Sequence, residues 1–198
     1  DEKNPNYYLY DNKFVISKSK ENNNSLIYCI KSIKAGNLII PDFIESIEPY
    51  SFNFYHGDSI SFSNESKIRT IKQYAFTYSK IFSISFPRSL KYISDSSFAE
   101  STEINSINFD EDSELEEIGP NSFFNICIGR IKSIVLPKTV KKIGEKAFYN
   151  CYNLECFQIP YDSNLQVIEY GAFAGTQIKK LYIPSNLQQL KDGWCCKI

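Results

Sequence analysis

Residues 131–148 carry the sequence IKSIVLPKTVKKIGEKAF, in which six apolar side chains stand at fixed offsets among polar ones. As a template, the stretch is I-x-x-I-x-L-P-x-x-V-x-x-I-G-x-x-A-F. The pattern recurs along most of the chain, and six of its copies end on a phenylalanine, at Phe52, Phe76, Phe98, Phe123, Phe148 and Phe173. These anchors lie 24, 22, 25, 25 and 25 residues apart. A period of this size predicts a solenoid of stacked coils.

Seven copies of the template follow one another, over residues 38–52, 60–76, 81–98, 104–123, 131–148, 154–173 and 178–190. Two lengths alternate along the array. The difference lies after the apolar-x-apolar segment. In odd copies the next apolar residue comes four positions after that segment's second apolar residue, as from Leu136 to Val140, and in even copies it comes six positions after, as from Phe62 to Ile68. The extra residues are polar, which predicts a longer surface loop. The alternation favours duplication of a two-copy block.

Each copy has the same physical interpretation. The apolar-x-apolar segment predicts a strand with both apolar side chains on one face, and a following proline ends it. The next apolar pair marks an inward contact on a turn, and the phenylalanine reaches the core from a short helical turn behind it. Stacked coils therefore predict one parallel concave sheet of about seven strands, with short strands, turns or short helical turns on the convex side.

The first 36 residues do not fit the template. Three strand-like runs, at residues 7–10, 14–17 and 25–29, predict a small β-hairpin or meander. Because a solenoid needs an atypical terminal unit over its first core face, we expect residues 1–36 to form a cap. Residues 37–198 then form one continuous array.

Composition and charge exclude several classes of protein. The net charge is −1, which argues against general nucleic-acid binding. Residues 95–117 contain nine carboxylates and no Lys or Arg, whereas nine Lys face five acids from residue 131 onward. No apolar run approaches the ~18 residues that predict a membrane span, so we expect no membrane insertion of this segment. The sequence has no Met, so we expect a processed or excised part of a longer protein.

The strings IVLPKTVKKIGEKAFYNC (134–151) and INFDEDSELEEIGPNSFFNIC (107–127) resemble the repeats of the BspA-type leucine-rich-repeat family. The resemblance covers about residues 7–190. It implies a leucine-rich-repeat solenoid, mixed α/β and mainly β. The family includes surface proteins of oral bacteria and parasitic protists that are linked to adhesion. The seventh copy departs by lacking A-F, and copies one to three carry Glu48, Lys72 and Ser94 in place of the glycine.

Nothing in the sequence points to catalysis, a cofactor or a metal. The only histidine, His56, has no motif-level partner and is interpreted as a solvated loop residue. The acidic run 110–117 does not match a calcium loop. Cys127 and Cys151 follow their phenylalanines at corresponding positions and form either a disulfide or two small buried residues, of which we favour the second. The roles of Cys195 and Cys196, and glycosylation at Asn23 and Asn64, are left open.

The best candidates for ligand binding are the residues between the core positions of the strands. Because side chains alternate on a strand, these residues point outward together if the apolar ones point inward. The predicted surface is small and polar at its centre and becomes basic and aromatic at one end. The residues are Ser83, Ser85, Ser106, Asn108, Ser133, Val135, Cys156, Gln158, Lys180 and Tyr182.

Two functions compete, and an enzyme is the least favoured third. The first is a non-catalytic adhesion module at the cell surface, or secreted, that binds a host matrix or cell-surface protein on the concave sheet. The alternative is a cytoplasmic leucine-rich-repeat scaffold that recognises partners through the opposed acidic and basic segments. The last copy shows no polar cap, so either the native chain continues or two copies associate at that edge.

Overall fold

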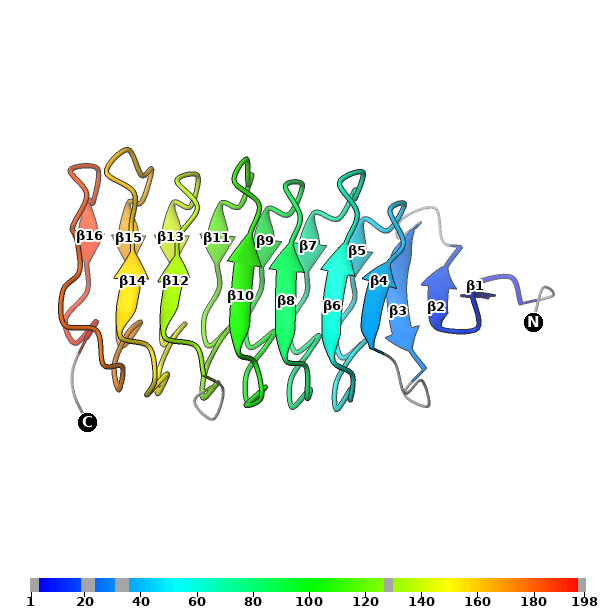
Figure 1. The fold of residues 1–198 in the computed structure, drawn as a ribbon. Coiled ribbons are helices and arrows are strands. Elements are labelled where there is room, and N and C mark those ends of the chain that lie inside the picture. The colour runs from blue at the N-terminus through cyan, green and yellow to red at the C-terminus, as the bar shows by residue number, and fades with distance from the viewer. Residues whose placement is uncertain (1–3, 19–23, 31–35, 127–129, 196–198) are drawn as a thin grey trace.

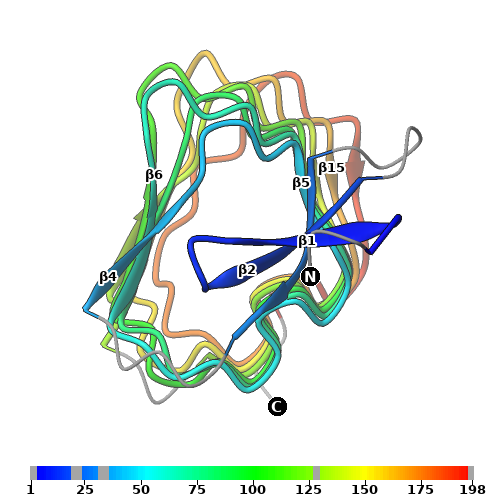
Figure 2. The same cartoon turned by 90° about the vertical axis from the view of Figure 1, so that its right-hand side faces the viewer.

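The computed structural model describes residues 4–18, 24–30, 36–126 and 130–195, and these form a β-solenoid of about seven coils. Figure 1 shows the coils side by side along one axis, with the N- and C-termini at opposite ends. Viewed along that axis, the coils superpose, with β4 and β6 on one side and β5 and β15 on the other (Figure 2). The predicted repeat solenoid is confirmed.

The apolar-x-apolar segments form the strands of one parallel face, which we call the long-strand face. Its first four strands pair in the order β4-β6-β8-β10, and β12 pairs separately with β14. Side chains alternate as predicted: in β8, Ile84 and Phe86 are buried and Ser85 is exposed. The strands are β4 (Asn37–Ile40), β6 (Ser59–Phe62), β8 (Ser83–Phe86), β10 (Ser106–Phe109), β12 (Ser133–Val135) and β14 (Cys156–Gln158).

The seventh copy does not add a strand to this face, contrary to the expectation for residues 181–183. This segment has no strand pairing, and both Tyr182 and Ile183 are exposed. The buried alternation that drives the other strands is therefore lost here, because one of the two apolar side chains faces solvent. Among the described residues, the seventh coil contributes only the strand β16 (Gln189–Leu190), on the opposite side of the solenoid.

The second residue of the later apolar pair in each copy, which the sequence suggested lies on a turn, belongs to a two-residue strand. These strands form a second parallel sheet, the short-strand sheet, in which Ile47, Ile71, Ile93, Ile118 and others stack in register and are buried. A strand of two residues is too short to show an alternation of apolar and polar positions, so the sequence could not predict it. The strands are β5 (Ser46–Ile47), β7 (Thr70–Ile71), β9 (Tyr92–Ile93), β11 (Glu117–Ile118), β13 (Lys142–Ile143), β15 (Val167–Ile168) and β16.

The N-terminal meander continues the short-strand sheet to ten strands. β1 (Tyr7–Tyr10) and β2 (Phe14–Ser17) pair antiparallel, as do β2 and β3 (Ser25–Cys29), and β3 pairs parallel with β5. β1 and β2 cross the N-terminal end of the stack (Figure 2). Phe14, Ile16 and Leu26 are buried in the same core as the repeats, so the meander covers the apolar face of the first coil. The boundary at residue 36 stays a prediction.

A column of phenylalanines runs through the core between the two sheets. The rings of Phe52, Phe76, Phe98, Phe123, Phe148 and Phe173 are buried and stack with centroids 4.5–5.6 Å apart. Backbone bonds run along the same column, as where Phe123 N–H donates to the Ala147 carbonyl at 2.8 Å. The surrounding residues form turns, and no helix occurs within the described residues. Trp194 closes the column with its ring 6.3 Å from that of Phe173, edge to face.

Candidate functional site

Eight of the ten predicted binding residues lie on the outward side of the long-strand face. They form two rows in strand register, with Ser83 beside Ser106 and Ser133 beside Cys156 in one, and Ser85 beside Asn108 and Val135 beside Gln158 in the other. Asn108 Nδ2 lies 3.4 Å from Ser85 Oγ, so neighbouring coils are also joined by side-chain hydrogen bonds.

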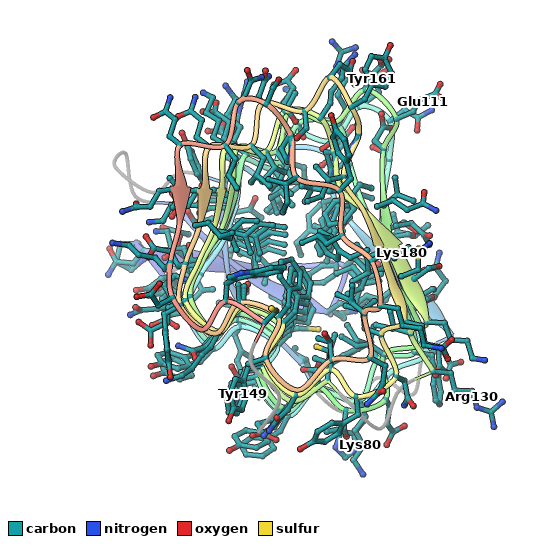
Figure 3. The ribbon with its side chains drawn as sticks, turned by 90° about the vertical axis from the view of Figure 1, so that its left-hand side faces the viewer. Lys80, Glu111, Arg130, Tyr149, Tyr161 and Lys180 are labelled. Atoms are coloured by element: carbon teal, nitrogen blue, oxygen red, sulfur yellow. The ribbon has the colours of Figure 1, made fainter. Side chains whose placement is uncertain are left out.

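The remaining two predicted residues belong to the seventh coil and lie outside any strand. Lys180 and Tyr182 are both exposed, in the segment where no seventh strand forms. Figure 3 shows Lys180 on the side of the long strands. They therefore extend the candidate surface without sharing its regular register.

The predicted binding residues leave out the outward positions of the first two strands of the face, although both strands were predicted. Ile39 of β4 and Ser61 of β6 stand in the same row as Ser85, and Ile39 is 60% exposed. Asn37 connects these strands, since its Nδ2 donates to Ser61 Oγ at 2.8 Å and its Oδ1 accepts from Ser59 at 2.9 Å. The template itself was the available signal, because these residues occupy the same variable positions in copies one and two.

The long-strand face is interrupted between β10 and β12, which share no paired residues. The number of positions from each core phenylalanine to the first buried residue of the next long strand changes at this point. It is 8 for Phe52–Ile60, 8 for Phe76–Ile84, 9 for Phe98–Ile107, 11 for Phe123–Ile134 and 9 for Phe148–Phe157. The longest approach to a strand therefore coincides with the interruption.

The hydrogen bonds change at the same place. Asn105 N–H donates to the Phe82 carbonyl at 2.7 Å and Glu155 N–H to the Lys132 carbonyl at 2.9 Å, each joining neighbouring coils. Lys132 occupies the matching position between them, and within the described residues its N–H has no such backbone acceptor. Arg130 N–H donates instead to the side-chain Oδ1 of Asn105 at 2.9 Å. A side chain thus replaces the main-chain contact where the ladder stops.

A cavity of about 530 Å³ opens beside this interruption, and we call it the β10–β12 hollow. Apolar side chains and two prolines form much of its lining, and charged residues stand among them. Glu111 lies at the corner where the long strands end, with Tyr161 (Figure 3). The lining residues are Ile107, Asn108, Phe109, Asp110, Glu111, Ser133, Val135, Leu136, Pro137, Lys138, Pro160 and Asp162.

The acidic part of the sequence does not form one uncompensated patch. Glu116 lies between Lys91 and Lys141, with nitrogen–oxygen distances of 3.8 and 2.8 Å, and Glu114 lies near both Arg69 and Arg88. The hydrogen bond from Lys141 holds the pKa of Glu116 below the usual carboxyl range, and the charges of Lys141 and Lys91 act in the same direction. Stacking places cations of neighbouring coils against the acidic run, which its linear sequence does not reveal.

The residues considered for chemistry remain dispersed. His56 is exposed and forms a β-bridge with Lys80. Burial raises the pKa of the Cys29 thiol to about 12, so it stays protonated at neutral pH. Cys151 is buried, with Sγ 3.4 Å from the Phe123 carbonyl, while Cys127 and Cys196 lie outside the described residues. In the part of the chain that the structure describes, no three His, Cys, Asp or Glu residues gather to hold a metal.

The same described ranges contain no helix that is both long and apolar enough to cross a membrane. No curated protein sequence gives a significant match to the chain.

Solved structures of bacterial leucine-rich-repeat proteins share this fold. A protein from Eubacterium ventriosum ATCC 27560 aligns with a TM-score of 0.77 and 17% identity over 95% of the chain and 48% of its own length. The leucine-rich-repeat protein of T. pallidum gives 0.64 and 22% identity over 85% and 74%. A leucine-rich cell surface protein from Faecalibacterium prausnitzii A2-165 gives 0.63 and 14% identity over 96% and 51%. The chain thus spans about half the length of the first and third of these proteins.

The repeats themselves match a known sequence family. The BspA type leucine-rich-repeat region matches in six copies, over residues 26–155 and 69–195, which together take in most of the chain. This match confirms the resemblance seen in the motif of residues 134–151. The chain belongs to the BspA-type leucine-rich-repeat family.

Proposed function

We propose that this chain is a non-catalytic module that binds a protein ligand on its long-strand face. The supporting observation is a contrast between the two sides of the solenoid. Ser85, Asn108 and Gln158 form an exposed polar row across the long strands. On the short-strand sheet, outward residues pair with one another, as Glu117 does with Lys142 at 3.3 Å. The row on the long-strand face therefore presents uncharged hydrogen-bonding groups that are not held in ion pairs, and these can bond a partner.

The proposed setting is a cell surface or the extracellular space, with a host matrix or cell-surface protein as partner. Family membership and the similar fold of a protein described as a cell surface protein support this setting. A scaffold that recognises partners through separated charges is less well supported, because Glu114 and Glu116 lie beside cations of neighbouring coils.

Binding to a panel of immobilised matrix proteins tests the face directly. Ser85→Arg and Gln158→Arg add bulk and charge to the long-strand face, and we expect each to weaken binding at least about tenfold. Tyr92→Arg is the matched control, since Tyr92 is a 41% exposed strand residue on the short-strand sheet. Equal loss in all three variants, or loss in Tyr92→Arg alone, would remove the long-strand face from the proposal.

The end of the array is a second element of the proposed surface. Replacing Lys180 and Tyr182 with Ala is expected to weaken binding to the same panel, because both are exposed beside the long strands. Unchanged binding would limit the surface to the strands themselves.

Location and self-association need separate measurements. Epitope tags on the native full-length protein should label intact cells, and labelling only after permeabilisation would contradict the proposed setting. We also propose association of two copies through the last coil, where Ile183 and Leu190 are 43% and 41% exposed. Light scattering that finds a strict monomer at high concentration would exclude it.

A further inference from the structure

We infer that the β10–β12 hollow determines the specificity of the long-strand face, and that it takes a basic side chain flanked by apolar residues from an extended segment of the protein partner. This inference rests on the proposed function. It adds which part of the face recognises the ligand, and what chemistry the ligand presents there.

The apolar part of the lining stands between polar neighbours on this face. Val135 is 57% exposed and stands in a row where Ser85, Asn108 and Gln158 are polar. Phe109, half-buried, and the two prolines Pro137 and Pro160 extend the apolar surface around it. Covering this surface would remove apolar area from water, which stabilises a complex. We therefore expect a segment with apolar side chains to bind the hollow more tightly than a segment with only polar side chains.

The net charge of the hollow favours an occupant of positive charge. Its lining holds three carboxylates, from Asp110, Glu111 and Asp162, and one ammonium group, from Lys138. Across the described residues none of these three carboxylates forms an ion pair, whereas Glu114, Glu116 and Glu117 further along the acidic run all do. The excess negative charge is thus concentrated at the hollow, where it favours a cationic group and repels an acidic one.

The volume and the interrupted ladder favour a short peptide segment over a single side chain. A cavity of about 530 Å³ lies within the range of ~300–1,000 Å³ that is usual for ligand sites. Ser133 lines the hollow, and within the described residues its N–H is not bonded to a backbone carbonyl of the preceding coil, although the matching Cys156 N–H bonds Lys132 at 3.0 Å. A partner carbonyl can accept from such a strand edge, as in strand addition.

The probe is a fluorescein-labelled heptapeptide, GVRPVKG, whose binding is followed by fluorescence anisotropy. Its matched peptides are GVEPVEG, with the charges reversed, and GSRGSKG, without apolar side chains. We expect GVRPVKG to bind at least about tenfold more tightly than either. Raising NaCl from about 50 mM to about 500 mM should weaken it, because the carboxylates are partly exposed.

Two pairs of variants locate the binding site. Val135→Arg fills the hollow and reduces its excess negative charge, and Ile39→Arg makes the same change on an equally exposed apolar residue of the same row, four strands away. Asp162→Lys reverses a charge at the hollow, and Glu65→Lys does so at the matching position of an earlier loop. We expect the first member of each pair to weaken GVRPVKG binding at least about tenfold, and the second to change it less than about twofold.

The outcomes separate this inference from the proposed function. If GVRPVKG does not bind, or binds wild type and Val135→Arg equally, the hollow is not the peptide site. This holds even if matrix proteins bind the long-strand face and Ser85→Arg weakens that binding. Peptide binding that Val135→Arg abolishes, without any matrix-protein binding, supports the hollow and contradicts the proposed class of partner. All four exposed positions are outside the core, and a circular dichroism melt verifies that each variant is folded.

Discussion

The two sheets are built from the same repeats, yet the short-strand sheet runs through ten paired strands while the long-strand face is interrupted between β10 and β12. In the six copies that end on a phenylalanine, the segment that connects the short strand to the core column has one length: five positions separate Ile47 from Phe52, and five separate Ile143 from Phe148. The segment before each long strand varies between 8 and 11 positions. Constant spacing maintains register, and length changes accumulate on the other face.

This difference separates structural from adaptable parts of the coil. The short strands and the phenylalanine column repeat without insertion and hold neighbouring coils in register. The long-strand face tolerates extra residues, which is usual for surfaces that carry binding sites. We therefore expect changes near the column to affect stability most, and changes near the hollow to affect binding.

The largest expected effect comes from removing the column that both sheets share. Phe123→Ala should lower the free energy of unfolding by roughly 3–5 kcal/mol, because it leaves a cavity between Phe98 and Phe148. Chemical denaturation followed by circular dichroism measures this. Phe124→Ala is the neighbouring control. The Phe124 ring stacks on Tyr149 at the surface, so its removal should lower the free energy of unfolding by only about 0.5–1.5 kcal/mol. Equal stability of Phe123→Ala and wild type would contradict the stacked core.

An intermediate effect is expected from crowding the short-strand sheet. A Cβ at Gly144, directly after β13, would lie 2.5 Å from Pro120 N and 2.6 Å from the Gly119 carbonyl carbon. Gly144→Ala should therefore cost about 1–3 kcal/mol in the same denaturation measurement. Glu169 occupies the matching position of the next coil and already carries a side chain, so Glu169→Ala should cost far less. If Gly144→Ala left the free energy of unfolding unchanged, the neighbouring coils would be able to move apart at this point without loss of stability.

The smallest expected effect concerns the ion pairs beside the short strands. The lowered pKa of Glu116 means that its pairing with Lys141 stabilises the fold above the ordinary carboxyl pKa, and that this is lost as the pH falls through the lowered value. Lys141→Ala should thus reduce the melting temperature at about pH 7 and have no effect at about pH 2. Lys179→Ala serves as control, since its ammonium group forms no ion pair within the described residues. A deficit in Lys141→Ala that persists unchanged at low pH would implicate packing instead.

Much of the fold could be predicted from the sequence, because each copy repeats its apolar positions. The alternation of Ile84, Ser85 and Phe86 defined a long strand, and the spacing of Phe98, Phe123 and Phe148 defined the core column. The short strands could not be predicted, because a two-residue strand has no period of its own and exists only through pairing with its neighbours.

The candidate site was predictable only as a surface. Alternation placed Asn108, Ser133 and Val135 on the outward side, and all three line the hollow. The hollow itself depends on a ladder that fails between two coils, and a template that aligns each copy separately cannot show this. The 11 positions from Phe123 to Ile134 were the one available signal.

Backbone hydrogen exchange measured by NMR tests the contrast between the two sheets most directly. The amides of Asn105, Lys132 and Glu155 occupy matching positions, and among the described residues only those of Asn105 and Glu155 bond a neighbouring coil. Gly144 N–H of the fifth coil bonds the Ile118 carbonyl at 2.8 Å. We predict that Lys132 exchanges at least about tenfold faster than the other three, a difference of ~1.4 kcal/mol in local opening. Equal protection of Lys132 would mean that the long-strand face is continuous, and would contradict the interruption on which the hollow depends.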